Sequence, residues 1–214
     1  MNSRAGDRVQ DLVDSSSSAV DHSQPETRPR VVNGLRRGIG HGIFLFLIAT
    51  ILALLEVQIE GADGWARALP TWRVEGALIK AITGGRPITG YHVYLWLLLL
   101  ALLHTPILFT KITRELEARL LGWFLLLTVS WDFLWFLWNP SFGLSKFRPD
   151  NIWWYTRWVL GIPIDYYVGI GLSLLVYLAG AHSRDRIGTQ AKEWTGTVVA
   201  LGLLTLVTVV VTWL

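Results

Sequence analysis

The chain has 214 residues, of which 52% are hydrophobic and only 16% are charged. Soluble domains carry about a quarter charged residues, so this composition excludes an ordinary soluble protein and favours one that lies in a lipid bilayer. The chain has no cysteine, which excludes disulfide bonds and thiolate-bound metals, and its net charge of +3 comes without a nucleic-acid-binding motif, so nucleic acid is not an expected partner.

The hydrophobic residues are grouped in blocks that are each long enough to cross a bilayer. A hydrocarbon core of about 30 Å takes roughly 20 residues of α-helix. The sequence therefore predicts an all-α fold, a polytopic integral membrane helix bundle with about five transmembrane helices and one or two interfacial helices. The predicted spans are residues 43–59, 91–109, 120–138, 164–181 and 196–213.

Residues 1–40 precede the first span and contain a run of serines, prolines and several arginines. Such a segment buries too little apolar surface to offset the entropy of folding, so it predicts a disordered, basic tail. Residues 41–214 form the predicted bundle.

Two segments between the spans are predicted to be interfacial helices. Within residues 65–82, apolar side chains recur at helical spacing with charged residues between them, which is typical of a helix that lies in the membrane interface. Residues 151–160 follow Asp150, a suitable N-cap, and are rich in Trp, which prefers the headgroup level.

Five spans would place the two termini on opposite sides of the membrane. Short loops rich in Lys and Arg usually stay in the cytoplasm. Residues 111–119 and 184–192 are such basic hairpins, and they fall on the same side as the arginines that precede the first span. We therefore expect a cytoplasmic N-terminus and a non-cytoplasmic C-terminus.

Ionisable residues within the spans are costly in lipid, so they usually face protein or a cavity. Glu56 and Glu60 end the first span on one helical face, since they are four residues apart. His92 opens the second span, Asp132 lies inside the third, and Asp165 opens the fourth. The predicted topology brings all five to the non-cytoplasmic end of the bundle. The predicted binding residues at the same end are Trp135, Asn139, Tyr166 and, from the outer loop, Arg157.

Carboxylates and a histidine in one place are typical ligands of a divalent metal ion, and a buried carboxylate is also suited to general acid–base catalysis. One hypothesis is therefore a membrane enzyme, or a metal- or ion-handling protein, with Asp132 and Glu56 as its catalytic groups. The predicted metal ligands are Glu56, Glu60, His92, Asp132 and Asp165. In the alternative hypothesis these groups reach water at the helix ends, and the protein is a non-catalytic accessory or scaffold subunit of a larger membrane complex.

The positions of the histidines argue against a bis-histidine haem. His92 and His104 lie on one predicted helix about 18 Å apart, and no other predicted span contains a histidine. Gly169 and Ser173 share a narrow face of the fourth span with Asp165, which predicts close packing of that span against the first.

Overall fold

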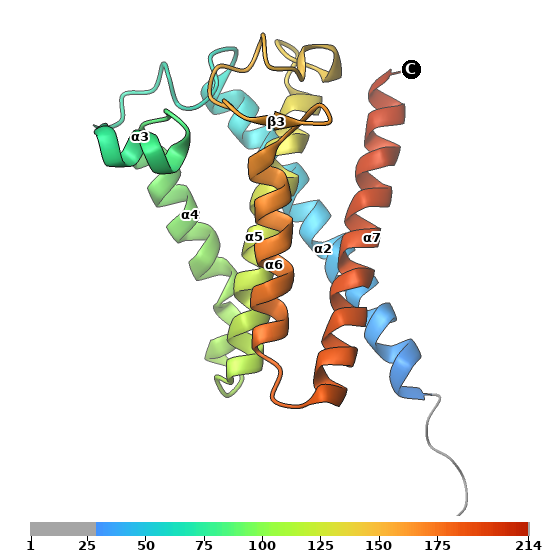
Figure 1. Ribbon diagram of the computed structural model, residues 1–214. Helices are drawn as coiled ribbons and strands as arrows, with labels where there is room; N and C mark the ends of the chain where they lie inside the picture. The colour runs from blue at the N-terminus through green and yellow to red at the C-terminus, as the bar shows by residue number, and fades with distance from the viewer. Residues whose placement is uncertain (1–28, 214) are drawn as a thin grey trace, which may run out of the picture.

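The computed structural model describes residues 29–213, and most of these residues are helical (Figure 1). Two short antiparallel strand pairs connect helices at one end of the molecule. The α-helices are α2 (Pro29–Glu60), α3 (Ala77–Thr83), α4 (Gly90–Leu103), α5 (Arg114–Trp138), α6 (Ile164–Ala179) and α7 (Arg184–Trp213). The strand pairs are β1 (Arg73–Val74) with β2 (Ile88–Thr89), and β3 (Trp158–Val159) with β4 (Ile162–Pro163), and the 3-10 helices are η1 (Thr105–Leu108) and η2 (Leu144–Lys146).

Three of the helices are long and apolar enough to cross a membrane, which supports a membrane location for the protein. They are residues Gly34–Glu60 of α2, all of α5, and residues Arg184–Thr212 of α7. Helices α4 and α6 are apolar but have only 14 and 16 residues. These two helices rise about 21–24 Å, less than a hydrocarbon core of about 30 Å, so the predicted count of five spans is not confirmed.

The predicted span 91–109 is shortened because Pro106 cannot continue an α-helix. Helix α4 ends at Leu103, and the chain continues as the 3-10 helix η1. His104 lies at this junction, where its Nδ1 is 2.6 Å from the carbonyl oxygen of Leu100 and its Nε2 is 3.1 Å from Glu117 Oε1.

The predicted interfacial helices are only partly present. Within residues 65–82, the one α-helix is the short α3, and β1 precedes it. The helix predicted at 151–160 is wrong, because the chain there forms turns followed by β3. Leu160 and Gly161 both have positive φ values, 49° and 77°, and form the two-residue turn that joins β3 to β4.

The N-terminal boundary of the bundle also differs from the prediction. Residues 29–40 belong to α2 and are helical rather than part of a tail, and Pro29 suits the first position of a helix because its ring fixes φ. The prediction of a disordered tail for residues 1–28 lies outside the described residues.

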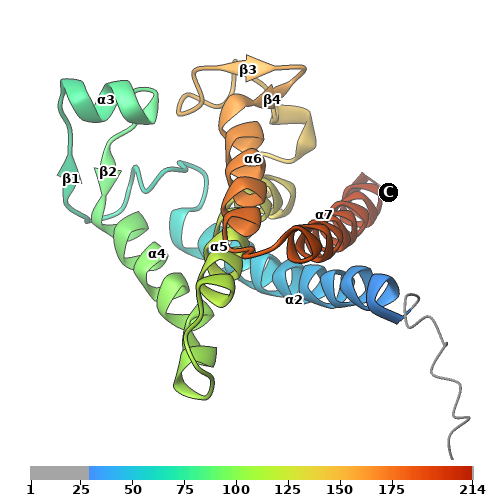
Figure 2. The ribbon, with the colours of Figure 1, turned by 60° about the horizontal axis from the view of Figure 1, so that its bottom comes forward.

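Helices α2 and α7 pack side by side, with glycines at their contact (Figure 2). A Cβ atom on Gly38 would overlap the backbone of Glu193, and one on Gly42 would overlap the backbone of Thr197. A Cβ atom on Gly196 of α7 would likewise overlap the backbone of α2, at Leu35. Small residues at this spacing allow two helices to approach closely in a membrane.

Replacing Gly38 by Leu is expected to lower the free energy of unfolding by more than the usual overpacking cost of about 1–3 kcal/mol, because the obstacle is backbone. Gly40→Leu is the matched control, since Gly40 lies on the same helix and a Cβ there would meet nothing within 4 Å. Thermal unfolding of both variants in detergent measures the difference. Equal stability of the two would show that close α2–α7 packing is not required.

Helix α5 lies at the centre of the bundle and packs against both α2 and α6. The small-residue face of α6 packs on α5 and not on α2 as predicted: Gly169 lies against Val129, and Ser173 donates a hydrogen bond of 2.9 Å to the carbonyl oxygen of Gly122. Helix α7 also begins 12 residues before the predicted span, and this first part carries the buried Glu193, which pairs with Arg119 of α5 at 3.2 Å.

Candidate metal centre

The end of α2 and the start of α4 bring two carboxylates and an imidazole together. Glu56 and Glu60 lie on the last turns of α2, and His92 lies on the first turn of α4. One ligand atom from each of the three lies within 4.8 Å of the others, and all three side chains are buried. This is the one group of three or more such side chains that the structure brings together within residues 29–213.

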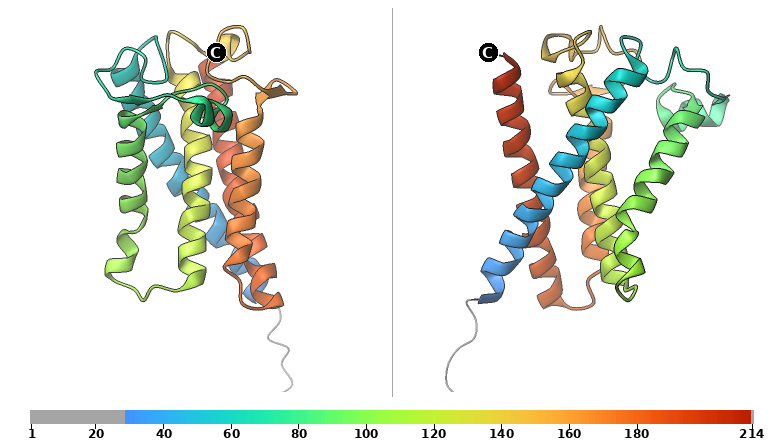
Figure 3. Two further views of the ribbon diagram at one scale, coloured as in Figure 1. Left: turned by 60° about the vertical axis from the view of Figure 1, so that its left-hand side comes forward. Right: turned by 180° about the vertical axis from the view of Figure 1, so that it is seen from behind.

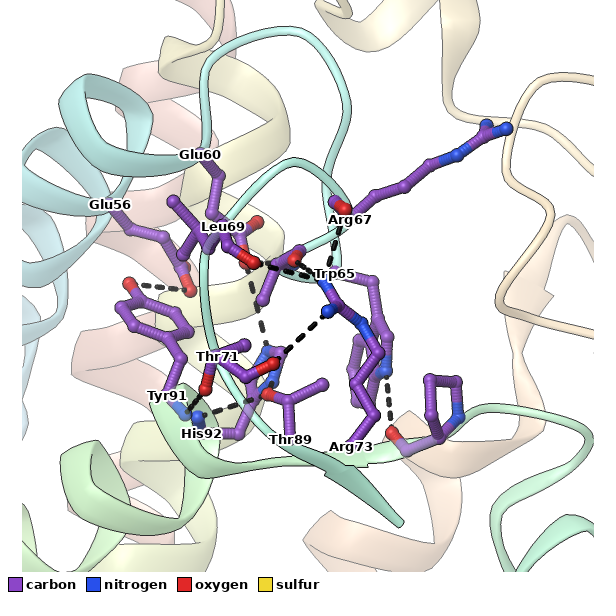
Figure 4. Close-up of polar contacts among 12 residues, drawn as sticks. Glu56, Glu60, Trp65, Arg67, Leu69, Thr71, Arg73, Thr89, Tyr91 and His92 are labelled. Atoms are coloured by element: carbon purple, nitrogen blue, oxygen red, sulfur yellow. Dashed lines mark hydrogen bonds and ion pairs between the residues drawn. The ribbon is translucent and has the colours of Figure 1, made fainter. Parts of the chain in front are cut away.

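The loop between α2 and β1 is folded around Glu60 (Figure 4). The backbone N–H of Ala66 donates a 2.5 Å hydrogen bond to Glu60 Oε1. Arg73 holds the loop in this shape, because its guanidinium donates hydrogen bonds to the carbonyl oxygens of Ala66, Arg67 and Leu69. Trp65 and Ala66 adopt left-handed backbone conformations, with φ values of 48° and 50°. Non-glycine residues rarely adopt this conformation, and where they do the surrounding structure enforces it.

The orientation of His92 is fixed by a contact on one ring face and by a hydrogen bond at one nitrogen. Its ring stacks on Trp65, with centroids 4.3 Å apart. Its Nδ1 lies 2.6 Å from the hydroxyl of Thr89, which also caps the N-terminus of α4. When Nδ1 carries the proton and donates to Thr89, the lone pair of Nε2 is free, and Nε2 is 3.8 Å from Glu60 Oε1.

The carboxylates of Glu56 and Glu60 have little positive charge near them. Glu56 accepts a hydrogen bond of 3.3 Å from the hydroxyl of Tyr91. Among the described residues, no Lys or Arg lies within ion-pair distance of Glu56 or Glu60. The one basic group within that distance is His92, which lies beside Glu60. Burying two charged carboxylates without a cation costs free energy. A bound metal ion, or protonation of the carboxylates, would remove this cost.

The three side chains open into a cavity of about 340 Å³ that is also lined by Asp132. Asp132 Oδ2 accepts a hydrogen bond of 2.9 Å from Tyr155 and another from Tyr166. Burial, together with the charge of Asp132, raises the pKa of Tyr155 well above its usual value. Tyr155 therefore stays protonated and remains a hydrogen-bond donor to Asp132 at all ordinary pH values.

Arg86 and Asp165 form an ion pair on the wall of the same cavity. The guanidinium of Arg86 is 2.8 Å from Asp165 Oδ1 and is largely buried, whereas the Asp165 side chain is 44% exposed. The Arg86 guanidinium carbon lies 4.8 Å from the centre of the Trp65 ring and 5.0 Å from that of Tyr155. The guanidinium of Arg86 thus interacts with Asp165 and with two aromatic rings, those of Trp65 and Tyr155.

The structure brings most of the predicted site residues to this cavity. Asp132 and Asp165 line it, although they are not part of the compact group of three. Asn139 is buried but does not line the cavity; its amide donates a 2.7 Å hydrogen bond to the carbonyl oxygen of Gly61, directly after the end of α2. Arg157 is exposed and is not a wall residue. The other predicted residues on the wall are Trp135 and Tyr166.

Sequence reasoning missed the residues that orient the site. Trp65, Thr89 and Tyr91 are ordinary aromatic and hydroxyl residues, and no spacing marks them as partners of Glu60 or His92. Arg86 was not missed in the same way: it is one of several basic residues of the outer loops that could pair with a buried carboxylate, and no local signal distinguishes it from the others.

A comparison of the chain with known proteins finds no matching family model, no similar curated protein and no similar solved structure.

Proposed function

We propose that the protein is a metal-dependent membrane enzyme whose divalent metal ion is bound by Glu56, Glu60 and His92. The observation that carries this proposal is the convergence of two buried carboxylates and one buried imidazole, with no Lys or Arg of residues 29–213 within ion-pair distance of either carboxylate. A bound divalent cation neutralises this charge and uses all three side chains as ligands.

The distances are close to those of a coordination sphere. Two tetrahedral ligands that are each about 2.1 Å from a metal ion are about 3.4 Å apart. His92 Nε2 and Glu60 Oε1 are 3.8 Å apart, and the whole group spans 4.8 Å, so small side-chain rotations complete the site. Nitrogen and oxygen ligands of this kind suit Zn²⁺, Mn²⁺ or Fe²⁺.

Three protein ligands leave at least one coordination position for water or substrate, which is the arrangement of catalytic rather than structural metal sites. The metal ion would lower the pKa of a bound water or polarise a substrate oxygen. Asp132 is the proposed proton acceptor, because it lies on the same cavity wall and is oriented by two phenols.

Purification in mild detergent followed by elemental analysis tests this proposal. We expect about one equivalent of a transition metal per chain, and we expect a chelator to lower the melting temperature, since an ion at 100 times its Kd adds about 2.7 kcal/mol of stability. Metal-free protein that a chelator does not affect would overturn the proposal. Stoichiometric co-purification of other chains with metal-free protein would favour the accessory-subunit hypothesis instead.

We also infer that α4 and α6 cross the membrane together with α2, α5 and α7, and that the N-terminus is cytoplasmic. The start of α2 and the end of α7 lie at opposite ends of the bundle, as an odd number of crossings requires (Figure 1). The basic hairpin residues 111–119 and 184–192 lie at the end where α2 begins.

The absence of cysteine makes this topology directly testable by single cysteine substitutions labelled with a membrane-impermeant thiol reagent. We expect Asp63→Cys and Asp150→Cys to react in intact cells, and Ile112→Cys and Ser183→Cys to react only after permeabilisation. The reverse pattern would contradict the orientation. Labelling of positions 63 and 112 from the same side would contradict a crossing by α4.

A further inference from the structure

The cavity continues below the carboxylates, toward the middle of the bundle. Trp96 lies one helical turn after His92, Thr128 lies one turn before Asp132, and both line the cavity. Because α5 runs in the opposite direction to α4, both positions are deeper by about 6 Å. Gly169 on α6 lines the cavity at the same depth.

This deep part of the cavity reaches the surface of the protein. Trp96, Thr128, Val129 and Gly169 are all partly exposed. Thr128 and Val129 lie in the middle of α5, a helix of 25 residues that is long and apolar enough to cross a membrane. Helices α4 and α6 both pack on α5 but hardly on each other, so the surface at the middle of α5 between them faces hydrocarbon, and the cavity opens toward the bilayer there.

The surrounding helices define where this opening lies. Helices α4, α5 and α6 stand side by side in that order (Figure 3, left), and α3 projects to the side of the bundle beyond the start of α4 (Figures 1 and 2). The wall therefore comes from α4 on one side, α6 on the other and α5 behind. On α3, Leu78 is 72% exposed, as expected for a short helix lying among lipid headgroups.

The upper part of the cavity is polar and has an unused hydrogen-bond donor. Trp135 lines this region, and its buried indole N–H has no acceptor in the part of the chain that the structure describes. Buried donors normally have a partner, and the oxygens of a bound molecule would supply it.

We infer that the substrate of the proposed enzyme is a membrane lipid, which enters sideways between α4 and α6 and places an oxygen-bearing headgroup beside Glu56, Glu60 and His92. This inference rests on the proposed function for the reaction, but the lipid site itself rests on the shape of the cavity. A cavity of about 340 Å³ is at the small end of ligand pockets, so it holds the headgroup region while the chains remain in the bilayer.

Photocrosslinking in lipid nanodiscs tests the inference, with a phosphatidylcholine that carries a diazirine near the head end of one acyl chain. We expect crosslinked peptides to include Trp96, Thr128 or Gly169. Thr128→Phe fills the deep part of the cavity and is expected to reduce this labelling at least about fivefold, equivalent to about 1 kcal/mol. Val207→Phe is the matched control, since Val207 is 59% exposed on α7 and is not a wall residue.

Thr128→Leu is a milder second variant, expected to fold normally and to reduce labelling by a smaller factor. Labelling that both Thr128 variants leave unchanged, or that is confined to the outer faces of the helices, would overturn the lipid site. Metal content measured on the same samples separates the two proposals. Labelling that depends on Thr128 in protein that never binds metal would support the lipid site and overturn the metal-dependent enzyme.

Discussion

Replacement of Glu60 by Gln is expected to lower the bound metal from about one equivalent to less than about a tenth, because the affinity falls by at least about 100-fold. Loss of residues that merely orient metal ligands typically costs 10–100-fold in affinity, and Glu60 is itself a proposed ligand. Gln has the same shape and still accepts the hydrogen bond from the backbone of Ala66, so the loop is expected to keep its fold. Elemental analysis after purification and dialysis measures the effect.

Glu75→Gln is the matched control for this variant. Glu75 is a carboxylate at the same end of the molecule, but its side chain is 55% exposed, and its partner Lys80 is 3.8 Å away and equally exposed. We expect this variant to bind metal as the wild type does. Equal metal loading of the Glu60 and Glu75 variants would exclude Glu60 as a ligand.

Replacement of Asp132 by Leu is expected to lower the free energy of unfolding by about 2–4 kcal/mol, because it removes the acceptor of two buried phenols. Tyr155 and Tyr166 are each only 7% exposed, and both donate their hydroxyl hydrogen to Asp132. Asp132→Asn keeps one acceptor oxygen, so a smaller loss is expected. Denaturant or thermal unfolding in detergent gives both values.

A second substitution shows whether the unpaired phenols cause this loss. In the Asp132→Leu background, Tyr155→Phe removes one donor that has lost its acceptor, and it is expected to restore part of the stability. The same Tyr155→Phe change in the wild type is expected to be destabilising, since it removes a hydrogen bond of 2.9 Å. Additive effects of the two substitutions would contradict the proposed coupling of Tyr155 to Asp132.

Asp132 and the proposed metal ligands can be singled out from the sequence because their signals are local. Glu56 and Glu60 are four residues apart on a continuous apolar helix, which places them on one face whatever the rest of the chain does. His92 was predicted at the start of the second span and lies in the first turn of α4. Depth along a helix follows from residue number, so the sequence could place these groups at one level of the bundle.

The helix partners were not predictable with the same certainty. Gly34, Gly38 and Gly42 are spaced by four residues, a pattern typical of close helix contacts, but all three lie before the first predicted span, residues 43–59. Gly169 and Ser173 on α6 form a similar pattern, which predicts packing of α6 on α2, whereas the structure packs them on α5. A narrow face shows that a helix packs closely, but it does not show which helix it packs against.

The sequence by itself thus determined that the chain has apolar helices suited to a membrane, and that one end of them carries carboxylates and a histidine. Helical periodicity and hydrophobicity are properties of short segments, which is why they can be read directly. Only the tertiary structure shows that the loop after α2 folds back, so that the backbone N–H of Ala66 donates to Glu60, and that Arg86 pairs with Asp165. The structure also has turns and β3 in place of the helix predicted at 151–160. Tyr155, which lies in this segment before β3, donates a hydrogen bond to Asp132. These features depend on contacts between residues far apart in the chain, and such contacts leave no regular spacing in the sequence.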